Sequence, residues 1–341
     1  MVVDVLRNNG PTMPDDSLRI HTIASPHAGP RLLVLGGVHG DETSGTQGIE
    51  RVLAEIDAGA LRLTRGQLTL VPVANPLARA RLTREGERNL NRSFRSRADP
   101  ADNEDRLTNL LCPLLDAHEV LLDLHSFQSA GEAFAMIGPR DNDEPLEPFA
   151  RAFEEGQLAL HLGLGTVVEG WLDVYAAGLA ARTGDGVVSE EALDFGRGTN
   201  EYMRSRGGYG ITLECGQHRD PVAPGVAYDA IHAALRRLGM VEQPSVVPPP
   251  PQLLRLVGVT DRQHEEDQFV REWATFDAVA QGEPIGSRAD GELLRAGRDG
   301  FIVFPNAGAA PGTEWFYFAV RSERDLGGSA SAPPATGSAR R

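Results

Sequence analysis

The sequence predicts a mixed α/β fold over residues 18–243, followed by a small domain of β-strands over residues 253–325. In the longer region, short apolar runs alternate with segments of helical periodicity, which is typical of α/β domains. Four consecutive prolines, Pro248 to Pro251, then interrupt the chain. Beyond them the pattern changes to short β-type runs separated by glycine-rich turns, which indicates a second unit of different architecture.

Each predicted element rests on its own pattern. Apolar or alternating runs predict strands at residues 31–35, 67–73, 120–124 and 209–215. Leucines at positions 107, 110, 111, 114 and 115 fall on one face of a helix, and residues 43–56 and 226–238 also have helical spacing. In the C-terminal domain we expect strands at residues 253–259, 276–280, 301–304 and 315–320.

The remaining segments are predicted to connect or flank these two domains. Residues 1–17 are expected to form a flexible N-terminal arm. The segment 244–252 is rich in proline, so it should be a stiff and extended linker. Residues 326–341 lose their apolar side chains and consist largely of Gly, Ser, Ala and Pro, a composition that predicts disorder.

Composition argues against several classes of function. The chain has 33 Lys and Arg against 48 Asp and Glu, a formal net charge of −15, so nucleic acid and anionic membranes are unlikely partners. No apolar run approaches the ~18 residues of a membrane-spanning helix, and no signal peptide is evident. Two cysteines cannot form a disulfide framework. We therefore expect a cytoplasmic protein; its oligomeric state stays open, a homo-oligomer included.

A candidate metal site begins in the segment Gly36-Gly37-Val38-His39-Gly40-Asp41-Glu42. His39 and Glu42 are three residues apart, so both side chains can face one ion within a helical turn. Imidazole nitrogen and carboxylate oxygen are suitable zinc ligands. The pair follows a predicted buried strand, a place where α/β proteins build their sites. The flanking glycines are expected to let the backbone approach a ligand closely.

His125 is the candidate third ligand, because it also ends an apolar strand. Both histidines can therefore lie at the same edge of one sheet, and a catalytic zinc needs three protein ligands and an open position. His264 and Asp267 have the same spacing as the first pair, but they lie in a polar stretch expected at the surface. We therefore predict that His39, Glu42 and His125 bind one metal ion.

Four segments, in the right order, resemble the succinylglutamate desuccinylase/aspartoacylase family of the zinc carboxypeptidase superfamily. These segments are Gly37 to Glu42, Asn89 to Phe94, Asp123 to Ser126 and Thr212 to Gly216. The resemblance implies a zinc-carboxypeptidase-like domain with a C-terminal β domain and one Zn²⁺ per chain, bound by His39, Glu42 and His125. It further implies hydrolysis of the amide bond of a small, anionic N-acyl amino acid or related amide.

The same resemblance implies roles for five other residues. Glu214 matches the catalytic glutamate, which activates water, and Arg84 matches an arginine that polarises the scissile carbonyl. Asn91 and Arg92 match a pair that holds a substrate carboxylate, and Arg204 matches a residue that binds a second carboxylate. A buried glutamate in an apolar strand is costly unless it is paired or functional, which independently favours a role for Glu214.

One expected feature is absent, and two rival interpretations remain. Aspartoacylase-type enzymes supply a tyrosine from the C-terminal domain, but residues 306–314 contain none, and Tyr317 lies in a strand-like run where a core role is expected. One rival is a zinc carboxypeptidase that cuts peptides. The other is a metal-binding regulatory protein without activity, which the intact set of site residues disfavours.

Overall fold

The computed structural model of the protein describes residues 2–7, 17–145, 147–183 and 189–326. Its helices are α1 (Ser44–Asp57), α2 (Pro76–Arg81), α3 (Asn103–Asp116), α4 (Ala152–His161), α5 (Trp171–Thr183), α6 (Glu190–Phe195), α7 (Thr199–Ser205) and α8 (Ala223–Arg237). Its strands are β1 (Val2–Arg7), β2 (Ser17–Ala24), β3 (Arg31–Leu35), β4 (Gln67–Val71), β5 (Val120–Phe127), β6 (Phe134–Met136), β7 (Thr166–Glu169), β8 (Tyr209–Gln217), β9 (Gln252–Asp261), β10 (Gln268–Phe269), β11 (Ala278–Val279), β12 (Pro284–Ser287), β13 (Leu293–Arg295), β14 (Gly300–Val303) and β15 (Glu314–Arg321).

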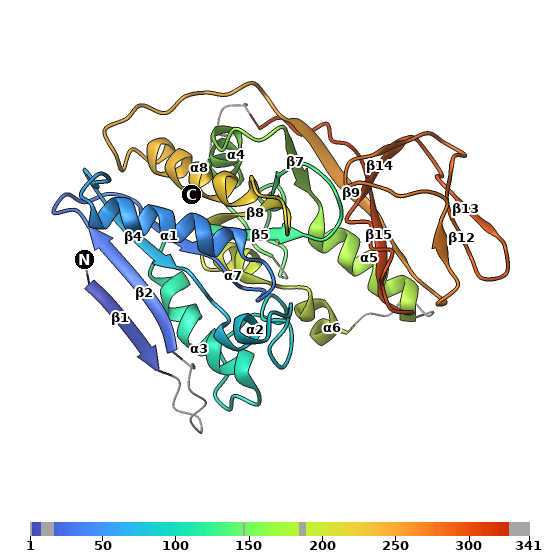
Figure 1. The fold of residues 1–341 in the computed structure, drawn as a ribbon, viewed down its shortest axis with the longest axis horizontal. Coiled ribbons are helices and arrows are strands. Elements are labelled where there is room, and N and C mark those ends of the chain that lie inside the picture. Colours follow the sequence, from blue (N-terminus) through green and yellow to red (C-terminus); the bar gives the residue numbers. More distant parts are fainter. Residues whose placement is uncertain (1, 8–16, 146, 184–188, 327–341) are drawn as a thin grey trace, which may run out of the picture.

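One mixed sheet of 12 strands, in the order β1-β2-β4-β3-β5-β8-β6-β7-β9-β15-β14-β11, runs through the molecule (Figure 1). Its centre is parallel, because β4, β3, β5 and β8 all run in one direction, whereas β6 is antiparallel to β8. All eight residues of β5 are buried, as expected for a central parallel strand covered on both faces. The predicted mixed α/β fold is confirmed.

Helices cover both faces of this sheet. On one face, α1, α4 and α8 lie together (Figure 1). Their apolar side chains, such as Ile49 and Ile231, belong to one buried cluster with Leu32 of the sheet. On the other face, α3 and α7 pack on a separate cluster that contains Leu33 and Leu111. Adjacent residues of one strand point to opposite faces, so the apolar run Leu32 to Leu35 of β3 serves both clusters. No helix among the described residues is long and apolar enough to span a membrane.

The predicted leucine helix is present as α3. Its first turn is stabilised by Asp102, whose side chain accepts a hydrogen bond from the Asp105 backbone N–H at 2.7 Å. Leu107, Leu111 and Leu115 are buried at four-residue intervals and face the sheet. The periodicity of the sequence therefore identified both the helix and its buried face.

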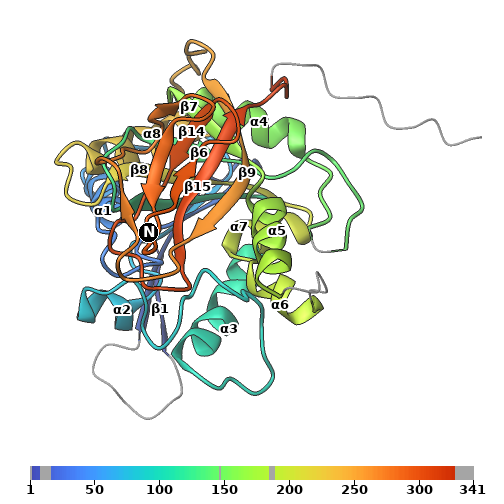
Figure 2. The same ribbon diagram turned by 90° about the vertical axis from the view of Figure 1, so that its right-hand side faces the viewer.

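The C-terminal strands continue the main sheet. After the proline-rich segment, β9 pairs in parallel with β7, and β15, β14 and β11 follow in antiparallel order. A separate three-stranded antiparallel sheet, β10-β12-β13, lies beyond them at the right-hand end of the molecule in Figure 1, the end that faces the viewer in Figure 2. The β-rich C-terminal region was predicted from sequence, but its backbone hydrogen bonds to β7 were not. The exact domain boundaries stay predictions.

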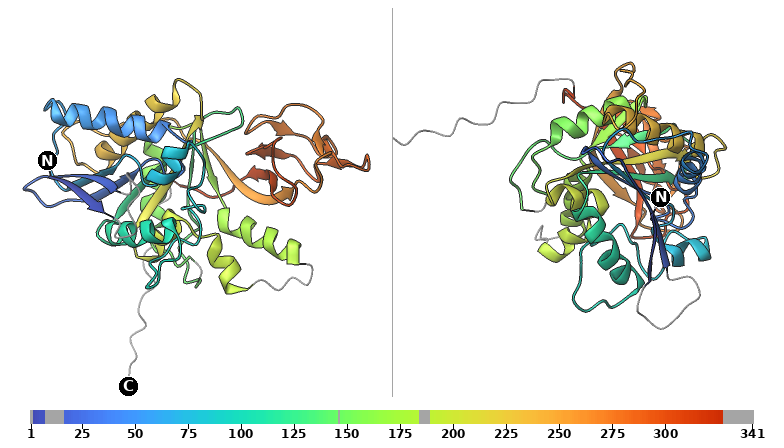
Figure 3. Two further views of the ribbon diagram at one scale, coloured as in Figure 1. Left: turned by 60° about the horizontal axis from the view of Figure 1, so that its bottom comes forward. Right: turned by 90° about the vertical axis from the view of Figure 1, so that its left-hand side faces the viewer.

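The opposite edge of the sheet differs from expectation. Residues 2–7, predicted to belong to a loose arm, form β1 and pair antiparallel with β2 (Figure 3). The sequence did not reveal β2 either, because its burial pattern is not a regular alternation. The rest of the predicted arm, and the predicted tail after residue 326, lie outside the described residues.

The parallel strands bring the predicted site residues to one edge of the sheet. β3 pairs in parallel with β5, and β5 pairs in parallel with β8. In this register His125 lies directly opposite Glu214. The loop that follows β3 carries His39 and Glu42 to the same edge, where α/β folds place their ligands.

Gly40 lies between the two predicted ligands of this loop, and a side chain there has no room. An added Cβ would lie 2.0 Å from the Ala78 carbonyl carbon and 2.3 Å from the Arg79 nitrogen, both in the α2 backbone. The glycine was expected to give access to a ligand. The structure shows that it lets the loop pack directly on a helix.

We predict that Gly40→Ala destabilises the protein by about 1–3 kcal/mol, because rigid backbone cannot yield to the new methyl group. Thermal or urea unfolding measures this. Gly297→Ala is the matched control, since a Cβ at Gly297 meets nothing within 4 Å. Equal stability of the two variants would show that the loop does not depend on this contact.

Candidate metal centre and active site

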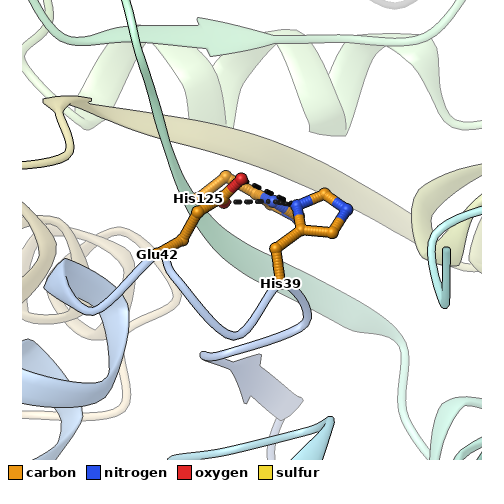
Figure 4. Close-up of side chains that lie close together, drawn as sticks. All are labelled: His39, Glu42 and His125. Carbon is orange, nitrogen blue, oxygen red and sulfur yellow. Dashed lines mark hydrogen bonds and ion pairs between the residues drawn. The ribbon is translucent and has the colours of Figure 1, made fainter. Parts of the chain in front are cut away.

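The side chains of His39, Glu42 and His125 converge in the interior (Figure 4). His39 Nδ1 lies 2.8 Å from Glu42 Oε1, and His125 Nδ1 lies 2.9 Å from Glu42 Oε2. The two Nδ1 atoms are 3.3 Å apart. All three side chains are 2% exposed, and their potential ligand atoms lie within 4.8 Å of one another. The three predicted ligands therefore form one buried group that can hold a metal ion.

The outer nitrogens of both histidines face oxygen atoms. His39 Nε2 lies 3.0 Å from Asn89 Oδ1, and His125 Nε2 lies 3.0 Å from Asp123 Oδ2. A proton on His39 Nε2 can be donated to Asn89, and the adjacent Asp123 carboxylate favours a proton on His125 Nε2, although that contact does not have hydrogen-bond geometry. Each Nδ1 lone pair is then directed at the common centre. Metal-binding histidines in proteins are oriented in this way, so the arrangement of donors fits a divalent cation.

The charges of the group favour the protonation states that a metal requires at His39 and Glu42, whereas at His125 they favour a bound proton. Burial lowers the pKa of His39 to about 4, which keeps its imidazole neutral. Burial would raise the pKa of Glu42, but the two histidines outweigh it and hold that pKa well below its usual range. For His125, the carboxylates of Asp123 and Glu42 overcome burial and raise the pKa. A divalent ion would take the place of the proton that these carboxylates attract.

Thr199 links the third ligand to a neighbouring loop. Its hydroxyl donates a short hydrogen bond to Asp123 Oδ2, the atom that faces His125. Its backbone N–H donates to Asn91 Oδ1 at 2.9 Å. Thr199 and Asp123 are fully buried, so this chain of contacts is shielded from water. It connects the segment that contains Asn91 with the orientation of the His125 ring.

Glu214 lies beside the three ligands with a carboxylate oxygen that has no partner. The residue is 8% exposed, and Oε2 makes no hydrogen bond among the described residues. Burial raises its pKa to about 8. The alternative interpretation, a structural ion pair, finds no support, since Glu214 forms no salt bridge within the described ranges. An unpaired buried carboxyl group in a cavity is typical of a functional site.

A cavity of about 470 Å³ opens onto this centre. Every residue that the sequence predicted for the site lines it: His39, Glu42, Arg84, Asn91, Arg92, His125, Arg204 and Glu214. Arg84 Nη1 donates to Glu42 Oε1 at 3.0 Å, while its side chain stays 47% exposed. The C-terminal strands supply part of the wall, including Phe304 and Tyr317. Tyr317, expected in the core, thus also faces the cavity.

Arg92 is a half-buried cation without an anionic partner in the described residues. Its Nη1 donates to the Asn91 carbonyl oxygen at 2.8 Å, and its guanidinium lies 5.0 Å from the centroid of the Trp171 ring. No carboxylate pairs with it in the part of the chain that the structure describes. Burial lowers its pKa, so a bound anion would stabilise its charge. Arg92 is therefore available to a substrate carboxylate.

Arg204 has a different environment from the one expected. Its guanidinium donates to Glu155 and Glu147, each at 2.7 Å, to Glu201 at 3.4 Å and to the Gly210 carbonyl at 3.1 Å. It is 4% exposed. These acceptors occupy most of its donors, so the contacts weigh against the predicted role as receptor for a second carboxylate. That role stays a prediction.

Several site residues were not singled out by sequence reasoning. Asp123 and His125 share one face of β5, so the two-residue spacing alone could have suggested the pair. Thr199 carries no such signal, because it meets Asp123 only through the packing of α7 against β5. The second His and Asp pair lies in the expected surface stretch, where His264 is exposed, but Asp267 is 3% exposed and bound to Arg288 at 2.7 Å.

Comparison with known proteins agrees with this geometry. Residues 28–162 match the model of the succinylglutamate desuccinylase/aspartoacylase catalytic domain. This segment of the chain therefore carries the catalytic domain of that family. The match includes His39, Glu42 and His125, so these three residues stand within the family's catalytic domain. A curated relative, N-α-acetyl-L-2,4-diaminobutyric acid deacetylase from Halomonas elongata, is 33% identical over 111 residues, which are 31% of this chain and 31% of that protein.

Solved structures of family members share the fold across the whole chain. A succinylglutamate desuccinylase/aspartoacylase from Rhodobacter sphaeroides has a TM-score of 0.68 at 18% identity and covers 94% of both chains. The product-bound ectoine utilization protein EutE from Ruegeria pomeroyi has a TM-score of 0.67 at 18% identity and covers 89% of both. At this identity the likeness establishes the architecture of the family, including the C-terminal strands.

The three converging ligands predict one divalent metal ion per chain. Metal analysis of the purified protein should find it, and His39→Ala and His125→Ala should each lose most of it, because two ligands rarely retain a catalytic ion. His264→Ala serves as the control, since its side chain lies away from this centre. Full metal content in both ligand variants would contradict the assignment.

We also predict that Thr199→Val lowers metal affinity by about 10–100-fold, as expected when the support of a ligand is removed. Valine keeps the shape of threonine but cannot donate to Asp123. Competition with a chromogenic chelator measures the affinity, and Thr199→Ser should restore most of it. Unchanged affinity in Thr199→Val would show that the hydroxyl does not orient His125.

Proposed function

We propose that the protein is a zinc-dependent deacylase that hydrolyses the amide bond of a small N-acyl amino acid. One observation carries the proposal: three ligand atoms converge beside an unpaired buried carboxyl group, Glu214, in a cavity of about 470 Å³. Two histidines and a glutamate are a known ligand set of catalytic zinc. The curated relative is named as a deacetylase of an N-acetylated amino acid, which supports this class of reaction.

The residues around the ligands have the chemistry that amide hydrolysis needs. Zinc, when bound, polarises a carbonyl group and makes water more acidic. Glu214 accepts a proton from the attacking water and returns it to the leaving nitrogen. A carboxyl group whose pKa burial raises to about 8 suits both transfers, because its two protonation states are close in free energy near neutral pH. Arg84 stabilises the negative charge that develops on the carbonyl oxygen.

The substrate class follows from Arg92. An N-acyl amino acid carries a free carboxylate, and Arg92 is a half-buried guanidinium in the cavity without a carboxylate partner in the described residues. A forked hydrogen bond between the two would anchor the substrate and remove the unfavourable burial of an isolated cation. Asn91 contributes indirectly, since its side-chain oxygen is engaged by the Thr199 N–H.

The rival functions are less well supported. A peptidase needs an open cleft for the chain on both sides of the scissile bond, whereas β15 and the loop after β14 wall this cavity with Tyr317 and Phe304. In a regulatory metal-binding protein, an unpaired buried carboxyl group beside the metal would cost stability without contributing to function. Both rivals nevertheless make distinct predictions for the variant described next.

Glu214→Gln should keep its fold and its zinc but lose about 10²–10⁴-fold in kcat, because an amide cannot accept the proton of water. Released amine from a panel of N-acyl amino acids measures turnover, and metal analysis confirms that zinc is retained. A matched Glu323→Gln variant, at an exposed site outside the cavity, should be unaffected. Near-normal kcat in Glu214→Gln would require another base. Absence of any amide hydrolysis by the zinc-loaded wild type would favour a regulatory role.

A further inference from the structure

Two of the four arginines of the cavity are already neutralised by the protein. Arg204 pairs with three glutamates, as described above. Arg182 forms two hydrogen bonds of 2.7 Å to Asp261 and a third of 3.2 Å to Glu314. Arg84 contacts Glu42. Among the cavity arginines, Arg92 is thus the one that has no carboxylate contact in the described ranges, and the cavity offers one site for a substrate carboxylate.

The wall beside Arg92 carries aromatic side chains and a carboxylate, and the other cation next to it, Arg182, is already paired with Asp261 and Glu314. Trp171 and Tyr317 lie against each other with ring centroids 5.7 Å apart, and Tyr175 lies 6.1 Å from Trp171. Glu314, at the start of β15, also lines the cavity and is 39% exposed. We call these four residues the acceptor wall: Trp171, Tyr175, Glu314 and Tyr317.

Tyr317 supplies an unpartnered polar group within this wall. The residue is 7% exposed and lines the cavity. Its hydroxyl has no hydrogen-bond partner in the described part of the chain. Burial and the nearby Glu314 raise its pKa, so the phenol stays protonated. Glu314 contacts Arg182 through Oε1, while Oε2 makes no hydrogen bond within the described residues. Both side chains therefore offer oxygen lone pairs to a ligand.

A second carboxylate would be unfavourable at this wall. It would face Glu314 without a free guanidinium to offset the repulsion, because Arg182 and Arg204 are engaged. A cationic group of the substrate is attracted instead: the free oxygen of Glu314, the phenol oxygen of Tyr317 and the tyrosine rings can contact an ammonium group, while Arg92 lies at the Trp171 ring. The ammonium and the carboxylate of one zwitterionic substrate can then occupy the acceptor wall and Arg92 at the same time.

We propose that the acceptor wall is a subsite for an ammonium group on the side chain of the amino acid that the enzyme releases. Glu314 is the specificity-determining residue, and Arg92 holds the α-carboxylate. This inference rests on the proposed function and narrows its substrates to N-acyl derivatives of basic amino acids. It replaces the acidic substrates with two carboxylates that the predicted role of Arg204 would select.

The test is a comparison of ligands that differ in side-chain charge but not in length. One series is N-acetyl-L-ornithine, N-acetyl-L-norleucine and N-acetyl-L-glutamate. A shorter series is the N-acetyl derivatives of L-2,4-diaminobutyrate, L-norvaline and L-aspartate. Calorimetric binding to the zinc-loaded Glu214→Gln protein avoids turnover. We expect the cationic member of at least one series to bind about tenfold more tightly than the neutral one, and the anionic member to bind most weakly.

Adding Glu314→Gln to this protein should remove the preference for the cation while leaving the affinity for the neutral ligand within about twofold. Glu323→Gln changes the net charge equally but lies outside the cavity, so it should preserve the preference. Tightest binding of the anionic ligands, or equal loss of cationic and neutral binding in Glu314→Gln, would overturn the inference.

Turnover by the wild-type enzyme separates this inference from the proposed function. Cleavage of the acidic or neutral amides in preference to the cationic ones would leave the deacylase intact and overturn the subsite. Selective binding of the cationic ligands without cleavage of any amide would support the subsite and refute the hydrolase.

Discussion

The buried carboxylate of Glu42 is the interaction on which the rest of the site depends. It lies between two imidazoles, accepts a hydrogen bond from the Ser126 backbone and contacts Arg84. An anion with 2% exposure is tolerable only when such donors surround it. The parallel register of β3 and β5 sets this arrangement, because it brings the loop of His39 beside the end of the strand that carries His125.

Sequence reasoning identified the features that depend on local spacing. The helix over the leucines and the three metal ligands were found because each follows from periodicity or from the end of a strand. The ion pairs of Arg204 were not found from the sequence, because Glu147 and Glu155 lie about fifty residues away along the chain and meet Arg204 only after α4 packs on β8. The parallel pairing of β9 with β7 was missed for a similar reason: a proline-rich segment marks a break in the chain, but it does not determine which strand follows on the same sheet.

The cavity distributes its charges by pairing most of them internally. Arg182 and Arg204 are held by carboxylates, whereas Arg92 and one oxygen of Glu314 remain for a ligand. A site of this kind discriminates by what it leaves unpaired, because a substrate group of the wrong sign must be desolvated without compensation. The family resemblance alone did not indicate this, since it identifies positions but not the partners that each side chain acquires.

The continuous sheet has a consequence for how substrates enter. β9 is joined to β7 by a ladder of backbone hydrogen bonds from Gln252 to Arg255, so the strands that bear Tyr317 and Glu314 cannot swing away as a rigid flap without breaking that ladder. Adaptation to different substrates is therefore left to side-chain rotation and to the loops at the mouth. The backbone of this wall therefore limits how far the cavity can widen, and a substrate that is too long is excluded sterically before any chemistry takes place.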